Sequence, residues 1–256
     1  PRYTHYMKDK TFYIYGRKPI EEQLLQNHEN ILRVFISDRV GSNEEDINQI
    51  KTFCKDKRIP FTKAAVKKIT SHVGDVNDQG VIALLKKPKY HDFNDWVDTL
   101  DTEKNQAVLV LDHIEDTHNF GAILRTAAAI GVSGVIVSKD RQAPLNATVF
   151  KTSAGAATKI PLVQVANINQ SIKRLQDNKF WVAAVDIPES KKDIIWEHTF
   201  DTPMAFVLGS EGRGVAEKTK ELCDFTVGLP LENDVESLNV SVAAASVLYE
   251  WKRQNR

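Results

Sequence analysis

Strand-like and helix-like hydrophobic patterns alternate along the first third of the chain. Apolar runs at residues 11–15, 31–38, 59–64 and 79–87 predict strands. Amphipathic stretches at residues 17–27, 43–58 and 65–74 predict helices, the first with Pro19 early in its first turn. Strands that alternate with helices indicate a small layered α/β sandwich.

Residues 88–106 are polar and acidic, apart from an amphipathic piece around Phe93, Trp96 and Leu100. This change in composition indicates a boundary between two domains, which is also what a chain of 256 residues favours. We therefore predict one domain at residues 1–90, a linker at 91–104 and a second domain at 105–256. Residues 1–6 precede Met7, so an artificial extension is one interpretation of them.

The alternation is clearer in the second domain. Predicted strands cover residues 107–114, 134–139, 160–166, 180–186, 204–208 and 225–231. Predicted helices cover residues 119–131, 146–157, 168–178 and 216–223, and a final helix begins near residue 238. The strands are continuously apolar, which is typical of parallel strands buried on both faces. A parallel α/β domain binds ligands at the carboxyl ends of its strands.

Composition narrows the class of protein. Lys plus Arg equals Asp plus Glu, at 34 each, so only a local basic patch can attract nucleic acid or a membrane surface. Cys54 and Cys223 lie far apart without metal-type spacing, which predicts a reducing, cytoplasmic compartment. No apolar run is long enough to cross a bilayer, and the seven histidines are scattered, so we expect no membrane span and no metal.

A first polar segment, "DHIEDTHNFGAILRTAAAIG" (112–131), follows the first strand of the second domain. Asn119 lies where loop becomes helix, and Arg125 follows six residues later. Both side chains can serve the same end of the helix only if Asn119 lies just outside it. An ordinary amide cap with an arginine in a structural ion pair is the alternative.

A second segment, "AFVLGSEGRGV" (205–215), ends a strand in a glycine-rich turn that exposes backbone amides and carries Glu211. It lacks the Gly-Lys-Ser/Thr ending of a phosphate-binding loop. A glutamate there would repel a polyphosphate and suits a cationic or zwitterionic ligand. A plain tight turn is the alternative.

A third segment, "LPLENDVESLNVSVAAASVLYE" (229–250), places acids and amides before a helix of small residues. In this order, the three segments resemble the signature motifs of the SpoU (TrmH) family of RNA ribose 2′-O-methyltransferases, in the SPOUT superfamily. The stretch from "YIYGRKPIEEQLLQ" to "QGVIALL" resembles the substrate-binding domain of the rRNA-modifying branch.

The resemblance implies a parallel-sheet domain with a deep trefoil knot, an exception to the rule that chains do not thread loops. It implies that the knot binds S-adenosylmethionine. The cofactor-binding positions it implies are Gly209, Ser210, Leu229, Leu231 and Leu238. The motif has changed at Asn233, where the family usually has glycine; asparagine tolerates a left-handed backbone, so we expect the turn to survive.

The catalytic positions that the resemblance implies are Asn119, Arg125, Glu211, Ser237 and Asn239. Ser237 and Asn239 would brace Glu211. A guanidinium stays protonated in proteins, so Arg125 would fix a phosphate and stabilise the developing alkoxide, whether or not it formally removes the proton. The resemblance also implies a homodimer with the active site at its interface; a core helix inside one monomer is the alternative for Ala243 to Ala245.

Local positive charge is concentrated in the first domain. The RNA-binding candidates are Lys67, Lys68, Lys86, Lys87 and Arg17. Phe53, Phe61 and Tyr90 lie among such residues and are candidates to stack on bases. A solvated lysine face is the alternative. The leading hypothesis is a methyltransferase acting on a guanosine of 23S rRNA; a tRNA enzyme of the same family and a catalytically idle RNA-binding or ribosome-assembly protein are the alternatives.

Overall fold

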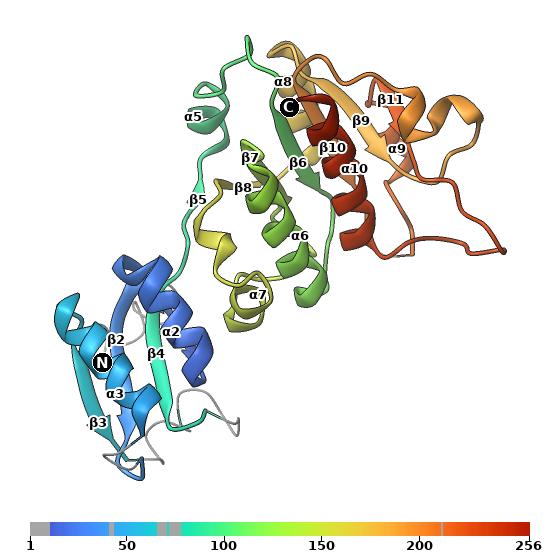
Figure 1. Ribbon diagram of the computed structural model, residues 1–256. Coiled ribbons are helices and arrows are strands. Elements are labelled where there is room, and N and C mark those ends of the chain that lie inside the picture. Colours follow the sequence, from blue (N-terminus) through green and yellow to red (C-terminus); the bar gives the residue numbers. More distant parts are fainter. Residues whose placement is uncertain (1–10, 41–43, 66–70, 72–77, 211) are drawn as a thin grey trace. The chain divides into compact units, whose positions relative to one another are not determined.

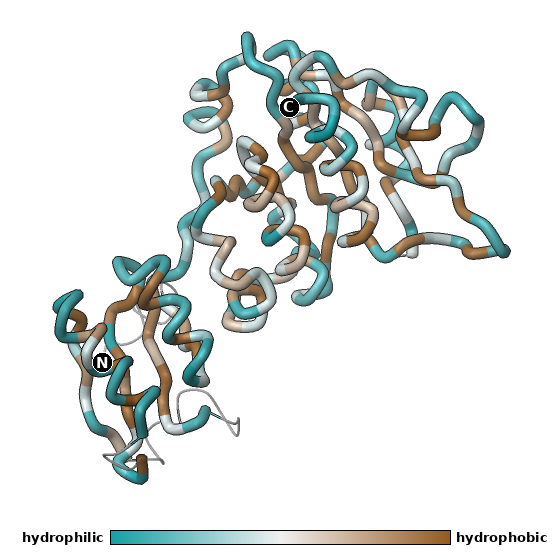
Figure 2. Tube along the Cα trace, viewed as in Figure 1, coloured by the Kyte–Doolittle hydropathy of each residue, from teal (hydrophilic) through white to brown (hydrophobic). Residues whose placement is uncertain are grey.

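The computed structural model describes residues 11–40, 44–65, 71, 78–210 and 212–256. They form two compact units, one made mostly of residues up to Lys87 and the other mostly of residues from Pro88 onward (Figure 1). In each unit, the hydrophobic residues concentrate on the strands and the polar residues on the outer turns (Figure 2). Among the described residues, no helix has the length and apolar character needed to span a bilayer.

The first unit is a four-stranded mixed sheet with helices packed on it. Its strands run in the order β1-β4-β2-β3; β4 is antiparallel to β1 and β2, and β2 is parallel to β3. The elements are β1 (Thr11–Tyr15), α2 (Arg17–Gln26), η1 (His28–Asn30), β2 (Ile31–Ser37), α3 (Glu45–Asp56), β3 (Phe61–Ala64) and β4 (Val81–Lys86). The α/β architecture confirms the fold class. The helix expected at 65–74 lies almost entirely outside the described residues.

The second unit is a seven-stranded parallel sheet in the order β11-β9-β10-β6-β7-β8-β5. Its strands are β5 (Tyr90–His91), β6 (Ala107–Leu111), β7 (Gly134–Ser138), β8 (Leu162–Val165), β9 (Trp181–Val185), β10 (Met204–Leu208) and β11 (Phe225–Val227). Its helices are α5 (Phe93–Val97), α6 (Thr117–Ile130), α7 (Ala147–Thr152), η2 (Ala156–Thr158), α8 (Ile168–Asp177), η3 (Lys191–Asp193), η4 (Ile195–Glu197), α9 (Glu217–Lys220) and α10 (Val240–Gln254).

The central strands of the large sheet are covered on both faces. Every residue of β6, β7 and β10 is buried, as the continuously apolar sequence predicts for parallel strands. Val108, Val110 and Ile136 share one core cluster with the apolar residues of α8. Helices α6 and α10 pack against each other and lie side by side (Figure 1).

The polar stretch between the domains carries structure of its own. Strand β5 adds an edge to the large sheet by pairing with β8, and α5 buries Trp96 and Val97. A Cβ on Gly134 would lie 2.5 Å from the Trp96 ring, so the indole occupies space that only glycine leaves open. Residues 91–104 thus include a packed helix where the sequence shows an amphipathic piece.

Candidate functional site

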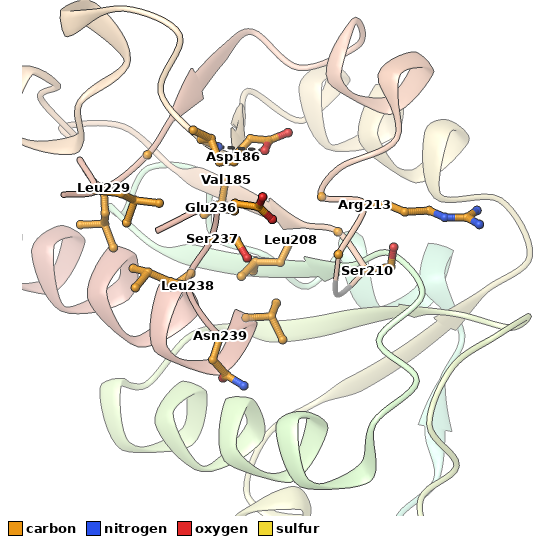
Figure 3. Close-up of a pocket in the computed structure, with 18 residues that line it drawn as sticks. Val185, Asp186, Leu208, Ser210, Arg213, Leu229, Glu236, Ser237, Leu238 and Asn239 are labelled. Atoms are coloured by element: carbon orange, nitrogen blue, oxygen red, sulfur yellow. Dashed lines mark hydrogen bonds between the residues drawn. The ribbon is translucent and has the colours of Figure 1, made fainter. Parts of the chain in front are cut away.

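A pocket of about 540 Å³ lies at the carboxyl ends of β9, β10 and β11, beside the start of α10 (Figure 3). It is lined by Val185, Asp186, Ile187, Leu208, Gly209, Ser210, Gly212, Arg213, Gly214, Gly228, Leu229, Leu231, Glu236, Ser237, Leu238, Asn239, Val240 and Ala243. The carboxyl edge of a parallel sheet is where such a fold forms ligand sites.

Glycines allow the strand ends to approach one another. A Cβ on Gly209 would lie 1.8 Å from the Gly214 carbonyl oxygen, and one on Gly228 would lie 2.2 Å from the Asp186 carbonyl oxygen. Gly212 and Gly214 have φ angles of 82° and 65°, which glycine adopts without strain. The pocket therefore depends on backbone geometry that side chains would obstruct.

All of the cofactor-binding candidates lie in this pocket. Its lining includes Gly209, Ser210, Leu229, Leu231 and Leu238. Leu238 is 39% exposed, so the pocket holds apolar surface that remains open to a ligand. Sequence positions almost thirty residues apart thus reach one cavity.

The turn of the third motif has the expected backbone. Asn233 has a φ of 56°, which confirms the prediction that asparagine supports the left-handed turn in place of glycine. Asp234 has the same φ of 56°, which the sequence analysis did not predict. The turn delivers Ser237 and Asn239 to the pocket lining.

Asn239 connects the pocket to α6 as well as to α10. Its Oδ1 caps α10 by accepting hydrogen bonds from the Ser241 N–H (2.9 Å) and the Ser241 hydroxyl (2.6 Å). Its Nδ2 donates to Asn119 Oδ1 at 2.9 Å. The first and third motifs are therefore joined by a direct side-chain hydrogen bond.

The position of Asn119 corrects one expectation. Helix α6 begins at Thr117, so Asn119 lies inside its first turn and not just outside the helix. The cap is Asp116, whose Oδ1 accepts from the N–H groups of His118 (2.7 Å) and Asn119 (2.8 Å). Asp116 therefore caps α6 through the backbone N–H groups, and the side-chain oxygen of Asn119 accepts the hydrogen bond from Asn239.

Two catalytic candidates, Arg125 and Glu211, are not seen in the pocket lining. Arg125 is exposed on α6 and does not line the pocket of its own chain. None of the ion pairs seen among the described residues includes Arg125, so the structural ion pair considered as an alternative is not observed there. Glu211 lies outside the described residues.

Three charged groups in the pocket were not among the candidates from the sequence: Asp186, Glu236 and Arg213. Asp186 follows β9, and its Oδ1 accepts a hydrogen bond from the Ile187 N–H at 2.8 Å. Arg213 extends away from the other labelled side chains (Figure 3). An acid directly after a buried parallel strand was the available signal for Asp186.

The surroundings of Asp186 leave the pocket with acidic character. Lys220 lies nearby, but its Nζ donates to Glu189 Oε1 at 2.5 Å. This hydrogen bond is the main cause that raises the pKa of Lys220, and the charge of Asp186 adds to it. Asp186 and Glu236 give the pocket two carboxylates beside the single guanidinium of Arg213, whereas Glu211, on which the prediction of a cationic ligand rested, is not described.

The RNA-binding candidates of the first unit are not equivalent. Lys86 is exposed and Lys87 is half-buried, whereas Lys67 and Lys68 lie outside the described residues. The Arg17 guanidinium pairs with Glu44 and lies 3.5 Å from Asp46.

Arg17 is thus held within the fold. Its Nε donates to the Gln79 carbonyl (3.2 Å), and its N–H donates to Gln79 Oε1 (2.9 Å). These bonds join the start of α2 to the turn before β4. Arg17 therefore has a structural role that the sequence could not indicate, because its partner acids lie 27 and 29 residues away, and its part in RNA binding stays a prediction.

The three aromatic candidates do not all lie in the first unit. Phe53 and Phe61 are half-buried in the first unit, whereas Tyr90 belongs to β5 in the large sheet. Burial raises the pKa of Tyr90 to about 12. No group of three His, Cys, Asp or Glu side chains suitable for a metal ion occurs among the described residues.

Two family models match the chain. The model of the SpoU rRNA Methylase family matches residues 106–249, and the model described as RNA 2′-O ribose methyltransferase substrate binding matches residues 13–91. The chain belongs to the SpoU rRNA methylase family. This confirms the family predicted from the three motifs.

Relatives extend the match over nearly the whole chain. A Staphylococcus aureus protein described as belonging to the TrmH tRNA/rRNA methyltransferase family is 37% identical over 242 residues, covering 94% of this chain and 95% of the relative. The SpoU methyltransferase AviRb from Streptomyces viridochromogenes, solved with AdoMet, has a TM-score of 0.76 at 20% identity and covers 97% of this SpoU family chain and 91% of its own.

A third similar structure is the TrmH/SpoU tRNA modifying enzyme from A. aeolicus. It is 26% identical, has a TM-score of 0.53, and covers 63% of this chain and 81% of its own. Taken with the family models, these similarities make the chain an S-adenosylmethionine-dependent RNA methyltransferase of the SpoU/TrmH family.

Proposed function

We propose that this SpoU family protein transfers a methyl group to the ribose 2′-hydroxyl of a guanosine in 23S rRNA. The observation that carries the proposal is the convergence of the three motifs around one pocket, where Asn239 hydrogen-bonds Asn119 at 2.9 Å. The match of residues 13–91 to a substrate-binding model of RNA 2′-O ribose methyltransferases supports the ribose as the acceptor.

The pocket residues fit S-adenosylmethionine, which supplies an activated methyl group on a sulfonium when bound. Leu229, Leu231 and Leu238 offer apolar walls for an adenine ring, and the glycine-rich turn offers backbone amides. Asp186 and Glu236 offer acceptors to hydroxyl and ammonium groups. Apolar walls combined with a few well-placed polar groups are common in ligand sites.

We infer that the chain is knotted at this pocket. Gly228 N–H donates to the Asp193 carbonyl (2.7 Å), and Ile195 N–H donates to the Gly228 carbonyl (3.0 Å). The chain at Gly228 also approaches the Asp186 carbonyl too closely for a Cβ. The segment leading to α10 is therefore bordered on two sides by the β9–β10 connection, as threading through that connection requires. The knot stays a prediction.

The chemistry needs positioning more than reactive groups. Transfer to a hydroxyl is a direct displacement, so holding donor and acceptor in line accounts for much of the acceleration. The Asn119–Asn239 bond fixes the start of α6 against the third motif, and we assign Ser237, Asn239 and Glu211 to the support of the catalytic loop.

We assign Arg125 to the RNA phosphate and to the developing alkoxide, in a homodimer. Arg125 is exposed and does not line its own pocket, so a second copy is the arrangement that brings it to one. Val242 (49% exposed) and Tyr249 (59% exposed) lie on α10, which packs on α6. Val242 and Tyr249 are seven residues apart, so they lie on one face of α10 and offer apolar surface to a second copy.

The first unit favours rRNA over tRNA as the substrate. The tRNA modifying enzyme from A. aeolicus covers 63% of this chain, whereas an rRNA methyltransferase from Sinorhizobium meliloti covers 98%. The share of this chain that the tRNA modifying enzyme leaves uncovered is about as large as the first unit, which carries the candidate lysines. We therefore assign RNA docking to Lys67, Lys68, Lys86 and Lys87.

Methyl incorporation tests the proposal. The purified chain would be incubated with tritiated S-adenosylmethionine and either unmodified 23S rRNA or unmodified total tRNA, both transcribed in vitro. We expect label in 23S rRNA and background counts in tRNA. Label in tRNA alone would support the tRNA alternative, and label in neither would support the idle RNA-binding alternative.

A further inference from the structure

Three residues link the loops that follow β6 and β7. Asp112 is only 5% exposed, and its Oδ1 lies 2.6 Å from His113 Nδ1. His113 Nε2 lies 3.3 Å from Arg141 Nη2. Because a guanidinium can only donate, a hydrogen bond at this contact requires Nε2 to accept, with the ring proton on Nδ1 facing Asp112. The series Asp112, His113 and Arg141 therefore orients the arginine from a buried carboxylate.

Backbone strain accompanies this link. His113 and Arg141 have φ angles of 63° and 48°, in the left-handed region that non-glycine residues rarely adopt. The two loops are also tied through Ile114, whose N–H donates to Gln142 Oε1 (3.3 Å) and whose carbonyl accepts from the Ala143 N–H (2.7 Å). Strain held by surrounding contacts is concentrated at functional sites in proteins.

Arg141 differs from the paired arginines of the chain. Arg17, Arg174 and Arg253 each lie within ion-pair distance of a carboxylate. Arg141 is exposed, and its described contact is with the His113 imidazole, while the adjacent Asp140 is not within ion-pair distance. It keeps its full charge, and most of its five N–H donors remain available to a ligand. A planar fork of this kind matches the oxygens of a phosphate.

The link lies on the same sheet edge as the pocket. Strand β6 pairs with β10 on one side and β7 on the other. The β7 end is therefore two strand spacings, roughly 10 Å, from the β10 end that lines the pocket. His113 also precedes α6, which carries Asn119 in its first turn. RNA that presents a ribose to the pocket would bring a neighbouring nucleotide to this corner.

We propose that Arg141, held by His113 and Asp112, binds a phosphate of the RNA adjacent to the methylated nucleotide. This inference rests on the proposed RNA methyl transfer. It makes Arg141 a substrate-binding residue and His113 a positioning residue. A clamp that only joins two loops would explain the contacts among these residues, whereas a phosphate site also uses the exposed guanidinium that these contacts hold at the carboxyl edge of the sheet.

The test compares Arg141→Gln with Arg174→Gln in the full-length protein. Arg174 is an exposed arginine near the end of α8, and a helix between parallel strands returns to their amino ends, so its loss is a matched control. Unmodified 23S rRNA and tRNA transcripts are the probes, and whichever is methylated is used for kinetics. KM for RNA, kcat, cofactor affinity and the melting temperature are measured for each variant.

We expect Arg141→Gln to raise KM for RNA about tenfold, the size of one charge-assisted contact, with kcat and cofactor affinity unchanged. The slope of log Kd against log salt should fall by roughly 0.7 to 1. Arg141→Lys should restore the salt slope but only part of the affinity, since a lysine lacks the fork. His113→Asn should raise KM less than Arg141→Gln while leaving the salt slope in place.

Arg141→Gln that behaves like Arg174→Gln would overturn this inference and leave the proposed function intact. A lowered melting temperature with unchanged KM would also overturn it, because a loop clamp predicts that result. If the wild-type protein methylates neither transcript, the proposed function fails, and this inference fails with it.

Discussion

The pocket of the second unit and the lysine-bearing face of the first unit would meet their ligands by different means. The pocket is shaped by backbone approaches that only glycine permits at Gly209 and Gly228, and by side-chain hydrogen bonds to Asn239. The first unit offers exposed cations such as Lys86, whereas its Arg17 is already paired with acids. We therefore expect the cofactor affinity of the pocket to fall abruptly when one side-chain carbon is added. The RNA affinity of the first unit should fall gradually as its positive charges are removed.

Gly209→Ala gives the largest expected effect. Its Cβ would lie 1.8 Å from the Gly214 carbonyl oxygen, so the turn cannot keep its conformation. We expect a loss of cofactor affinity of about a hundredfold or more and a destabilisation of roughly 3 kcal/mol. Calorimetric titration with S-adenosylmethionine and thermal unfolding measure the two effects.

Gly131→Ala is the matched control for this substitution. Gly131 ends α6 with a φ of 82°, and a Cβ there meets nothing within 4 Å. It should cost about 1 kcal/mol of stability from backbone strain and leave cofactor affinity unchanged. Equal effects of the two substitutions would remove the claim that close approach at Gly209 shapes the pocket.

Arg125→Ala should lower turnover by about a hundredfold or more, the effect of losing one electrostatic stabiliser. Cofactor affinity should be nearly unchanged, because Arg125 does not line the pocket of its chain. Arg125→Lys should rescue poorly, since a point charge does not reproduce the planar guanidinium. Single-turnover methylation measures the effect, and full activity of the alanine variant would eliminate the proposed role.

Replacing the lysines of the first unit should produce a graded effect. A quadruple variant at Lys67, Lys68, Lys86 and Lys87, each changed to glutamine, should flatten the salt dependence of rRNA binding, by roughly 0.7 to 0.9 in slope for each phosphate that is no longer neutralised. Cofactor affinity should not change. Filter binding at several salt concentrations measures the slope.

Arg17→Gln sharpens the same comparison. Its guanidinium is committed to Glu44 and Asp46, so the substitution should lower the melting temperature of the first unit while the salt slope of RNA binding stays the same. If Arg17→Gln instead reduced the salt dependence of RNA binding and left stability unchanged, Arg17 would be an RNA-binding residue.

Substitutions of Asn239 have the smallest expected effect on stability. They distinguish its role as the cap of α10 from its hydrogen bond to Asn119. Asn239→Ala removes the α10 cap and should cost about 1 kcal/mol. Asn239→Asp keeps a capping oxygen but loses the Nδ2 donor to Asn119, so it should preserve stability and still lower turnover. Equal turnover for Asn239→Asp and the wild type would show that the bond between the motifs is dispensable.

The sequence predicted those features that local pattern determines. Strands β6, β7 and β10 were predictable because burial on both faces leaves no polar position. The left-handed turn at Asn233 was predictable from the resemblance, because the family usually has glycine there and asparagine tolerates the same backbone.

Features that depend on distant partners were not predictable. The partner acids of Arg17 lie 27 and 29 residues away. Asp116 competes with Asn119 for the cap of α6, and the sequence offers both residues as caps. Trp96 is buried because Gly134 leaves space for its ring, a fit that polar neighbours of Trp96 in the sequence conceal.

The identity of the methylated atom tests the central claim most directly. Unmodified 23S rRNA would be incubated with the protein and S-adenosylmethionine carrying a deuterated methyl group, then digested to nucleosides and analysed by mass spectrometry. The account predicts labelled 2′-O-methylguanosine, with loss of the label in Arg125→Ala. A label carried on the base, or a ribose label that persists in Arg125→Ala at the wild-type rate, would contradict it.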